Sequence, residues 1–507
     1  MKYAIRKLSI IVMSAAVLNL AAPAPRLVEA QELAEFEKRM TKFTLGNGLK
    51  FLVLERHEAP VVSFHIYADV GCSDEVKGIT GLAHLFEHMA FKGSKTIGTK
   101  NYKAEVKAMA KMDAAFLALK AERRKGDRAD NSRMEKLQEQ FEEAQQEAQE
   151  YLVHDEFEEA YVREGSTGFN AYTGYDATRY VVSLPSNKVE LWMSLESDRF
   201  LNPVLREFYK EKDVVMEERR MAENMPQFRL VEEFLAIAYK AHPYGEPIVG
   251  HMSDLKTLTR AEAEAFFKKY YSPSNLTIAI VGDVNPDRIR SLAEKYFGRI
   301  PSSPKPEPVE TVEPPQVGER RVAVEDKAQP IFVVGYHKPG FNDPNNAVFD
   351  AITDIMGIGR TSRLYKSLVK EKKIAIAASG FQGWPGNKYP SLFWFYAVPA
   401  KGHTNQECEE AIYAEIERLK TELVLPEELE KAKTRSRASL IRELASNEGL
   451  AAETAFYEVV SGDWRNMFKQ LEKIDQVTAE DIQRVAKQYF TTKNRTVGVI
   501  ETIAIED

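Results

Sequence analysis

The chain has 507 residues, of which 44% are hydrophobic, so it is long enough to bury the cores of more than one domain. Its formal net charge is -7, and Lys and Arg are interspersed among nearly equal numbers of Asp and Glu. This balance gives no electrostatic basis for binding nucleic acid, and we expect no nucleic-acid partner.

The first 30 residues have the layout of a secretory signal peptide. A basic start with Lys2, Arg6 and Lys7 precedes an apolar run, and a small-residue exit follows near Ala30. The run is too short for a comfortable membrane span, although an uncleaved anchor is the alternative interpretation. No other stretch is apolar enough to cross a bilayer. We therefore expect export, with a periplasmic location and no stable membrane insertion after signal removal.

The chain contains two cysteines, Cys72 and Cys408, which lie far apart in the sequence. An export route would permit a disulfide between them, but a chain of this size does not need one. We predict that both are buried thiols.

The mature chain is predicted to be an α+β protein made of two similar halves. Segments 258–282 and 477–501 each read as a capped helix, a polar turn and a β-branched strand. This self-similarity indicates a duplicated domain, although a chance likeness between two such units is the alternative. The matching residues are Thr259 with Thr478, Tyr270 with Tyr489, and Asn275 with Asn494.

A proline-rich segment separates the two halves. We predict an N-terminal domain over residues 31–300, a semi-rigid linker over 301–318, and a homologous C-terminal domain over 319–507. Each half opens with two strand-like stretches followed by helices. One charged, helix-prone segment, at about 101–164, has no counterpart in the second half. Its apolar spacing predicts an inserted antiparallel helical hairpin whose charge is mostly a solvated face.

The run GLAHLFEHM carries the strongest chemical signal. On a helix, His84 and His88 share a face and can point at one ion, while Glu87 projects near the same site. Two imidazoles suit zinc, and a carboxylate beside the metal can accept a proton from bound water. A chance cluster on an amphipathic helix is the alternative. The residues expected to pack the opposite face are Leu82, Leu85, Phe86 and Met89.

Such a site needs a third protein ligand, which leaves one position for water. Residues 206–225 read as an acidic helix on which Glu211 and Glu218 lie on one face, two turns apart. One of them can ligate the metal while the other orients a histidine. Spacing alone does not choose between Glu217 and Glu218.

Together these residues resemble the pitrilysin/insulysin metallopeptidases, the inverzincins. The resemblance rests on His84-x-x-Glu87-His88, on NAYTGYDATRY from Asn170, on ERRMAEN after KDVVMEE, and on HPYGEPIVG from His242. It covers essentially the whole mature chain, and the length is similar to compact two-domain bacterial members and to mitochondrial processing peptidase subunits. It implies two homologous sheet-plus-helices domains that form half of a clamshell.

The resemblance also implies roles for individual residues. His84, His88 and Glu218 would hold one zinc ion, Glu87 would be the general base, and Glu211 would support a ligand histidine from behind. The separation of His88 and Glu218 is longer than in typical members because the hairpin is inserted between them. The edge strand expected to hold the substrate carries Asn170, Ala171, Tyr172 and Thr173.

One departure from the family pattern concerns the substrate. Active members commonly use an Arg and a Tyr, seven residues apart in the second domain, to hold the substrate backbone. The matching positions here are Val369 and Ile376, whose side chains donate no hydrogen bond, while Arg363 and Tyr365 have the wrong spacing. We therefore expect a paralogous partner subunit to supply the pair, or a homodimer.

The resulting prediction is a zinc-dependent endopeptidase that hydrolyses unfolded peptides or short protein fragments. Two alternatives belong to other classes: a non-catalytic assembly subunit of the same fold, and a periplasmic binding module in which the histidine pair is structural. The sequence does not identify the substrate.

Overall fold

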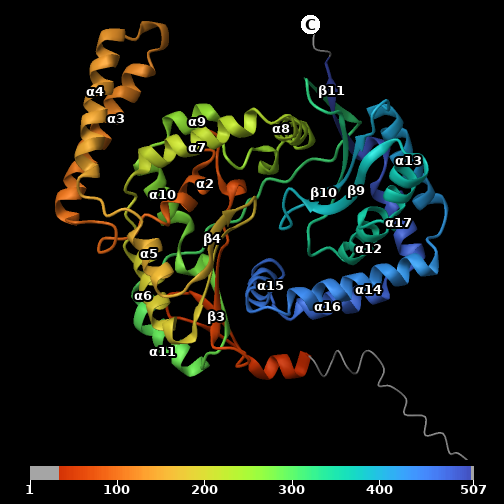
Figure 1. Ribbon diagram of the computed structural model, residues 1–507, viewed down its shortest axis with the longest axis horizontal. Helices are drawn as coiled ribbons and strands as arrows, with labels where there is room; N and C mark the ends of the chain where they lie inside the picture. The colour runs from red at the N-terminus through yellow and green to blue at the C-terminus, as the bar shows by residue number, and fades with distance from the viewer. Residues whose placement is uncertain (1–32, 504–507) are drawn as a thin grey trace, which may run out of the picture. The chain divides into compact units, whose positions relative to one another are not determined.

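The computed structural model of the protein describes residues 33–503 (Figure 1). From Met40 onward, the described chain forms one compact unit. The predicted signal peptide, residues 1–30, lies outside the described residues. Within the described part, no helix is both long and apolar enough to span a membrane.

The first half contains a six-stranded mixed sheet in the order β1-β2-β6-β3-β5-β4. β2 and β6 pair in parallel, whereas the other neighbours are antiparallel. β4 therefore lies at an edge, with one side free of strand pairing. The strands are β1 (Met40–Thr44), β2 (Lys50–Glu55), β3 (Val61–Ala68), β4 (Thr167–Thr173), β5 (Thr178–Pro185) and β6 (Leu276–Gly282).

The second half contains a five-stranded mixed sheet in the order β7-β11-β8-β10-β9. Its last strand, β11, pairs in parallel with its first, β7, as β6 does with β2 in the other sheet. The strands are β7 (Arg320–Asp326), β8 (Ile331–Lys338), β9 (Ala375–Trp384), β10 (Ser391–Pro399) and β11 (Arg495–Thr502). Residues 301–317 form neither helix nor strand, and the domain boundaries around them stay predictions.

Helices cover both sheets, which confirms the α+β class. Besides the helices described below, they are α2 (Leu82–Met89), α6 (Val189–Leu201), α7 (Phe208–Glu223), α9 (Met252–Thr257), α11 (Pro286–Tyr296), α12 (Asn346–Gly357), α13 (Asn405–Thr421), α14 (Pro426–Glu443) and α16 (Asn466–Gln476). Cys72 and Cys408 are free and buried, as predicted.

The repeated helix–turn–strand units have the same local construction. Thr259 and Thr478 cap α10 (Arg260–Tyr270) and α17 (Ala479–Tyr489), each in a reciprocal capping box with an acid three residues later. In the turns, the side-chain amides of Asn275 and Asn494 donate to the carbonyls of Tyr270 and Tyr489, both over 2.8 Å. The matching polar residues therefore form equivalent caps and turn hydrogen bonds in the two halves.

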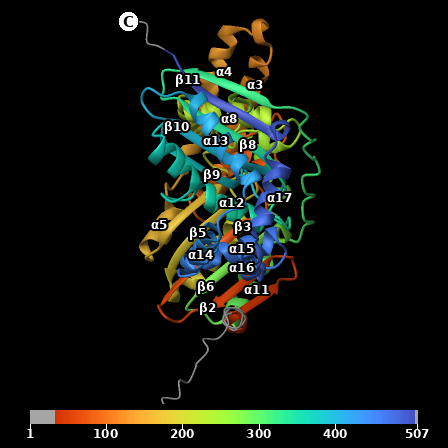
Figure 2. The same cartoon turned by 90° about the vertical axis from the view of Figure 1, so that its right-hand side faces the viewer.

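One helix from each half packs against the sheet of the other half. α8 (Pro226–Ala238), from the first half, packs against β7 and β11, and α15 (Asn447–Val460), from the second, packs against β3 and β6. Figures 1 and 2 both place α15 beside β3. Phe234 of α8 is fully buried over Gly335 and Gly498, where an added Cβ would lie 2.9 and 3.0 Å from its ring. This exchange holds the two sheets together.

The segment predicted to be an inserted hairpin contains two long helices, α3 (Tyr102–Arg123) and α4 (Asn131–Gln149), which pack against each other. In Figure 1 they extend away from the first sheet. The buried part of their contact is apolar, with the rings of Phe116 and Phe141 5.5 Å apart, and Lys111 pairs with Glu147 at its exposed side. The helix α5 (Glu156–Arg163) follows and leads back to β4.

Candidate metal centre

The two histidines predicted to bind metal lie one turn apart on α2, where their ring centroids are 4.9 Å apart. The opposite face of the helix is buried in the core of the first half. The apolar residues therefore lie on one face of α2 and the histidines on the other, as predicted. Both imidazoles face away from the core, toward α7. The buried residues on that opposite face are Leu82, Ala83, Leu85, Phe86 and Met89.

Glu218 of α7 completes the group. Its carboxylate oxygens lie 3.7 Å from Nε2 of His84 and 3.7 Å from Nε2 of His88. One ligand atom from each of the three residues lies within 4.8 Å of the other two. Glu217, the alternative, instead forms an ion pair with Arg220, and its side chain is 62% exposed.

The donor set fits a zinc ion. Separations of 3.7 Å are too long for hydrogen bonds, and they are close to the roughly 3.3 Å between donors that bind one tetrahedral zinc at about 2.0–2.1 Å. Burial, with a smaller contribution from His88, lowers the pKa of His84 to about 4. The His84 ring is therefore neutral near pH 7, which is the form that binds metal. Two histidines and one carboxylate leave a fourth position open.

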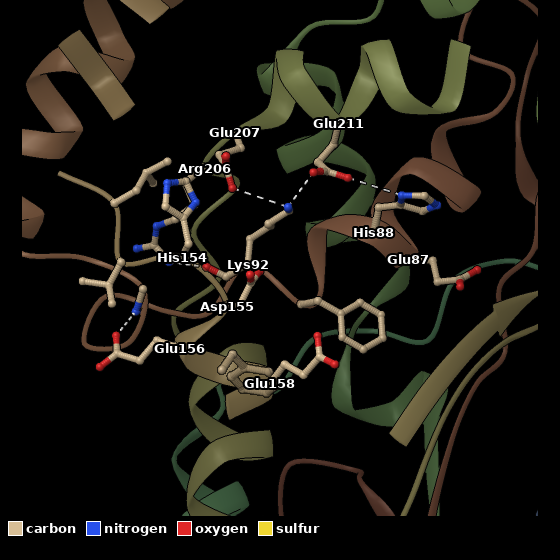
Figure 3. Close-up of a pocket in the computed structure, with 15 residues that line it drawn as sticks. Glu87, His88, Lys92, His154, Asp155, Glu156, Glu158, Arg206, Glu207 and Glu211 are labelled. Atoms are coloured by element: carbon tan, nitrogen blue, oxygen red, sulfur yellow. Dashed lines mark hydrogen bonds and ion pairs between the residues drawn. The ribbon is translucent and has the colours of Figure 1, made fainter. Parts of the chain in front are cut away.

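Glu211, predicted to support a histidine, does lie behind His88. Its carboxylate is 3.4 Å from Nδ1 of His88 and 2.5 Å from the ammonium of Lys92, which also approaches Glu207 (Figure 3). Burial opposes the charge of Glu211, but the hydrogen bonds with His88 and Lys92 outweigh it and lower its pKa to about 2. Such a contact orients the ring so that Nε2 faces the metal position. Nδ1 of His84, by contrast, is buried without a partner among the described residues.

Glu87 lies beside the histidines and is held by the edge strand. The hydroxyl of Thr173 donates to its carboxylate over 2.6 Å. Burial raises the pKa of Glu87 above its usual value, although the Thr173 hydrogen bond opposes this shift. A raised pKa makes a carboxylate a stronger base.

The four residues predicted to bind substrate all lie on β4. Their side chains alternate: Ala171 is buried, Thr173 contacts Glu87, and Asn170 and Tyr172 are exposed. Ala171 pairs with Tyr180 of β5, so the outer main-chain groups of β4 are left available at the sheet edge. An edge of this kind can accept an added strand. Their role in binding substrate stays a prediction.

The sequence did not reveal what holds the start of α2. Gly81, its N-cap, has no side chain, and the buried carboxylate of Glu75 accepts instead from the backbone N–H groups of Gly81 and Ala83, over 2.8 and 2.6 Å. Gly250 lies in the segment HPYGEPIVG that begins at His242, and its loop passes close to the start of α2. A Cβ added at Gly250 would lie 2.4 Å from the backbone nitrogen of Gly81, so the close approach requires glycine. In the sequence, the local sign of this capping role for Glu75 is an acidic residue that precedes a helix with glycine at its N-cap.

Two sequence profiles of one peptidase family match both halves. "Insulinase (Peptidase family M16)" matches residues 50–121 and 149–251, and "Peptidase M16 inactive domain" matches residues 257–436. The chain belongs to peptidase family M16. The gap in the first match lies within the α3–α4 hairpin.

Relatives are similar over most of their length. The zinc protease PqqE of Helicobacter pylori is 27% identical over 464 residues, which cover 90% of this chain and 91% of the relative. A probable mitochondrial-processing peptidase subunit beta of Arabidopsis thaliana is 22% identical over 96% of this chain and 82% of its own. The crystal structure of a protease from Helicobacter pylori is 25% identical, with a TM-score of 0.76 over 91% of this chain and 99% of that one.

These findings establish the type of enzyme. The chain is a zinc protease of family M16, of the two-domain bacterial type related to the mitochondrial processing peptidase. The periplasmic protease PqqL of Escherichia coli, 17% identical, shares the fold with a TM-score of 0.69 over 92% of this chain and 48% of its own.

The second half provides no arginine–tyrosine pair at the positions predicted from the family. Val369 lies in a π-helical turn, Tyr365–Glu371, and Ile376 lies on β9. Arg363 is buried, and Nε and one terminal nitrogen of its guanidinium donate to the Glu428 carboxylate over 2.9 and 2.7 Å. It is therefore engaged within the second half and is not available to hold a substrate.

The geometry predicts that Glu218→Gln weakens zinc binding at least about 100-fold, because even an outer partner of a metal ligand contributes about 10–100-fold. Glu217→Gln is the matched control, because it removes a neighbouring carboxylate that is far more exposed. Competition with a zinc chelator measures both affinities. Loss of zinc from Glu217→Gln with retention by Glu218→Gln would contradict the assigned ligand set.

Proposed function

We propose that the chain is a zinc-dependent endopeptidase in which His84, His88 and Glu218 hold one zinc ion and Glu87 is the general base. The observation that carries the proposal is the approach of Glu218 to both imidazoles, with Glu87 on the same helix. The names of the zinc protease relatives support the metal and the reaction.

When bound, zinc supplies Lewis-acid chemistry, since it acidifies water and stabilises negative charge on the substrate carbonyl. Glu87 accepts a proton from the attacking water and returns it to the leaving amine. Thr173 positions the Glu87 carboxylate through a hydrogen bond of 2.6 Å. Burial raises the pKa of Glu87, which favours retention of the proton between these two steps. Glu211 keeps the His88 ring turned toward the metal position.

The proposed substrates are unfolded peptides or short protein fragments. Strand addition at β4 pairs the main chain of the substrate with the free edge beside Thr173. Only an extended segment with unpaired N–H and C=O groups can bind in this way, and a folded protein has few of these. Because Thr173 contacts Glu87, a strand bound there places a peptide bond near the base.

Replacement of Glu87 by Gln is expected to lower peptide hydrolysis by about 10²–10⁴-fold, because the amide cannot accept the proton. Zinc content, measured on the same samples, should stay at the wild-type level, since Glu87 is not in the ligand group. Removal of zinc by a chelator should abolish hydrolysis, and added zinc should restore it. Wild-type activity in Glu87→Gln would refute the general-base assignment.

We also propose that a paralogous partner subunit supplies the missing arginine and tyrosine; a homodimer is the alternative. We propose in addition that assembly occurs in the periplasm after export. The engaged state of Arg363 and the apolar residues Val369 and Ile376 support the first part. The signal-like start and the periplasmic relative support the second.

The test is to isolate the tagged full chain from the periplasmic fraction, identify what co-purifies, and compare peptide hydrolysis with and without that subunit. The expected outcome is a stoichiometric second subunit whose addition raises the rate. Full activity of the isolated monomer would contradict a requirement for any partner, and absence of the chain from the periplasmic fraction would contradict the proposed location.

A further inference from the structure

A pocket of about 300 Å³ opens beside the metal group and has no assigned role. Glu87 and His88 line one end of it (Figure 3). Residues 152–158, which comprise the connection from the α3–α4 hairpin and the first turn of α5, line the other end. We refer to it as the side pocket. A side chain that enters it belongs to a residue close to the bond on which Glu87 acts.

The arginine and the lysine that line the side pocket are already neutralised. Arg206 is buried, and it donates to the carboxylate of Glu105 over 2.7 and 3.2 Å and to backbone carbonyls. Lys92 is placed between Glu207 and Glu211, at 3.4 and 2.5 Å. Neither cation is available to a ligand.

Two carboxylates of the side pocket, in contrast, have no counterion. Within the described part of the chain, the side chains of Asp155 and Glu158 form neither an ion pair nor a hydrogen bond, and both residues are exposed to solvent. Glu156, between them, accepts from the backbone N–H of Gly98 over 2.5 Å. The outer end of the pocket is therefore acidic and open to solvent.

The walls of the pocket suit an aliphatic stem. Phe91, Leu152, Val153 and Phe157 line it together with the charged residues. Long cationic side chains bury their methylene stem along apolar surface and keep the charged end beside polar groups. A neutral polar side chain would form no charge pair with the carboxylates, and an acidic one would be repelled by them.

We propose that the side pocket binds a lysine or arginine side chain of the substrate, at a residue next to the scissile bond. This inference rests on the proposed peptidase function and adds a substrate preference to it. The stem lies between the apolar walls, and the cationic end lies against Asp155 and Glu158.

The test uses pairs of peptides that differ only in Lys or norleucine at one position, scanned across the cleavage site. Binding is measured by fluorescence anisotropy to the full-length, zinc-loaded Glu87→Gln protein, so that affinity is obtained without turnover. Hydrolysis by the chain with wild-type Glu87 is measured in parallel. At one position next to the cleaved bond, we expect the Lys peptide to bind roughly tenfold more tightly, from two partly screened charge pairs.

Variants that change the charge of the side pocket test whether it causes the preference for the Lys peptide. Glu158→Gln together with Asp155→Asn should remove the tenfold preference, and Glu158→Lys should turn it into a preference for a Glu peptide. Asn is suited to position 155, where φ is +55°. The matched control is Glu159→Gln, on the same helix: Glu159 is exposed, pairs with Arg163 over 3.3 Å and does not line the pocket. The control should keep the preference.

Equal affinity for Lys and norleucine peptides at every position would overturn the inference while leaving the peptidase function in place. The inference also fails if the variants change the oligomeric state, measured by sedimentation, and leave peptide preference unchanged, because a partner subunit would then occupy the pocket. Charge-dependent binding without any hydrolysis, by the zinc-loaded wild type alone and with its co-purified subunit added, would instead refute the peptidase function and keep the side pocket.

Discussion

The candidate site depends on one contact between distant parts of the chain: the approach of the Glu218 carboxylate on α7 to the imidazoles of His84 and His88 on α2. Without a metal ion, this arrangement places a carboxylate beside two partly buried rings at distances too long for hydrogen bonds. A charge that is partly withdrawn from water is stabilised by an opposite charge, and the Glu218 side chain is 39% exposed. A zinc ion bound there would supply that charge, so this contact links the packing of the first half to the chemistry proposed for the site.

The rest of the first half keeps α2 and α7 in this relation. Glu75 caps the start of α2, and Gly250 allows a loop to cross it closely. Glu211, which precedes Glu218 on α7, contacts both His88 and Lys92, so α7 is attached to this part of the chain behind His88 as well as at the candidate metal position. The exchange of α8 and α15 then couples this arrangement to the second sheet. Rigid support of this kind is what a precise catalytic geometry requires.

The parts predicted from the sequence are those with local causes. The face shared by His84 and His88 follows from helical spacing, and the repeated caps at Thr259 and Thr478 follow from a short motif. The exchange of α8 and α15 could not be predicted, because it depends on packing between residues hundreds apart, such as Phe234 over Gly498. The choice of Glu218 over Glu217 came from the family resemblance, since the two acids are neighbours on α7 and only the packing of that helix decides which of them faces the histidines.

The central claim is that His84, His88 and Glu218 hold one zinc ion. Anomalous diffraction from crystals of the zinc-loaded protein, collected on both sides of the zinc absorption edge, tests it most directly. We predict one strong peak within about 2.0–2.2 Å of Nε2 of both histidines and of a Glu218 oxygen. A peak at other residues, or none at α2 in fully zinc-loaded crystals, would contradict the claim.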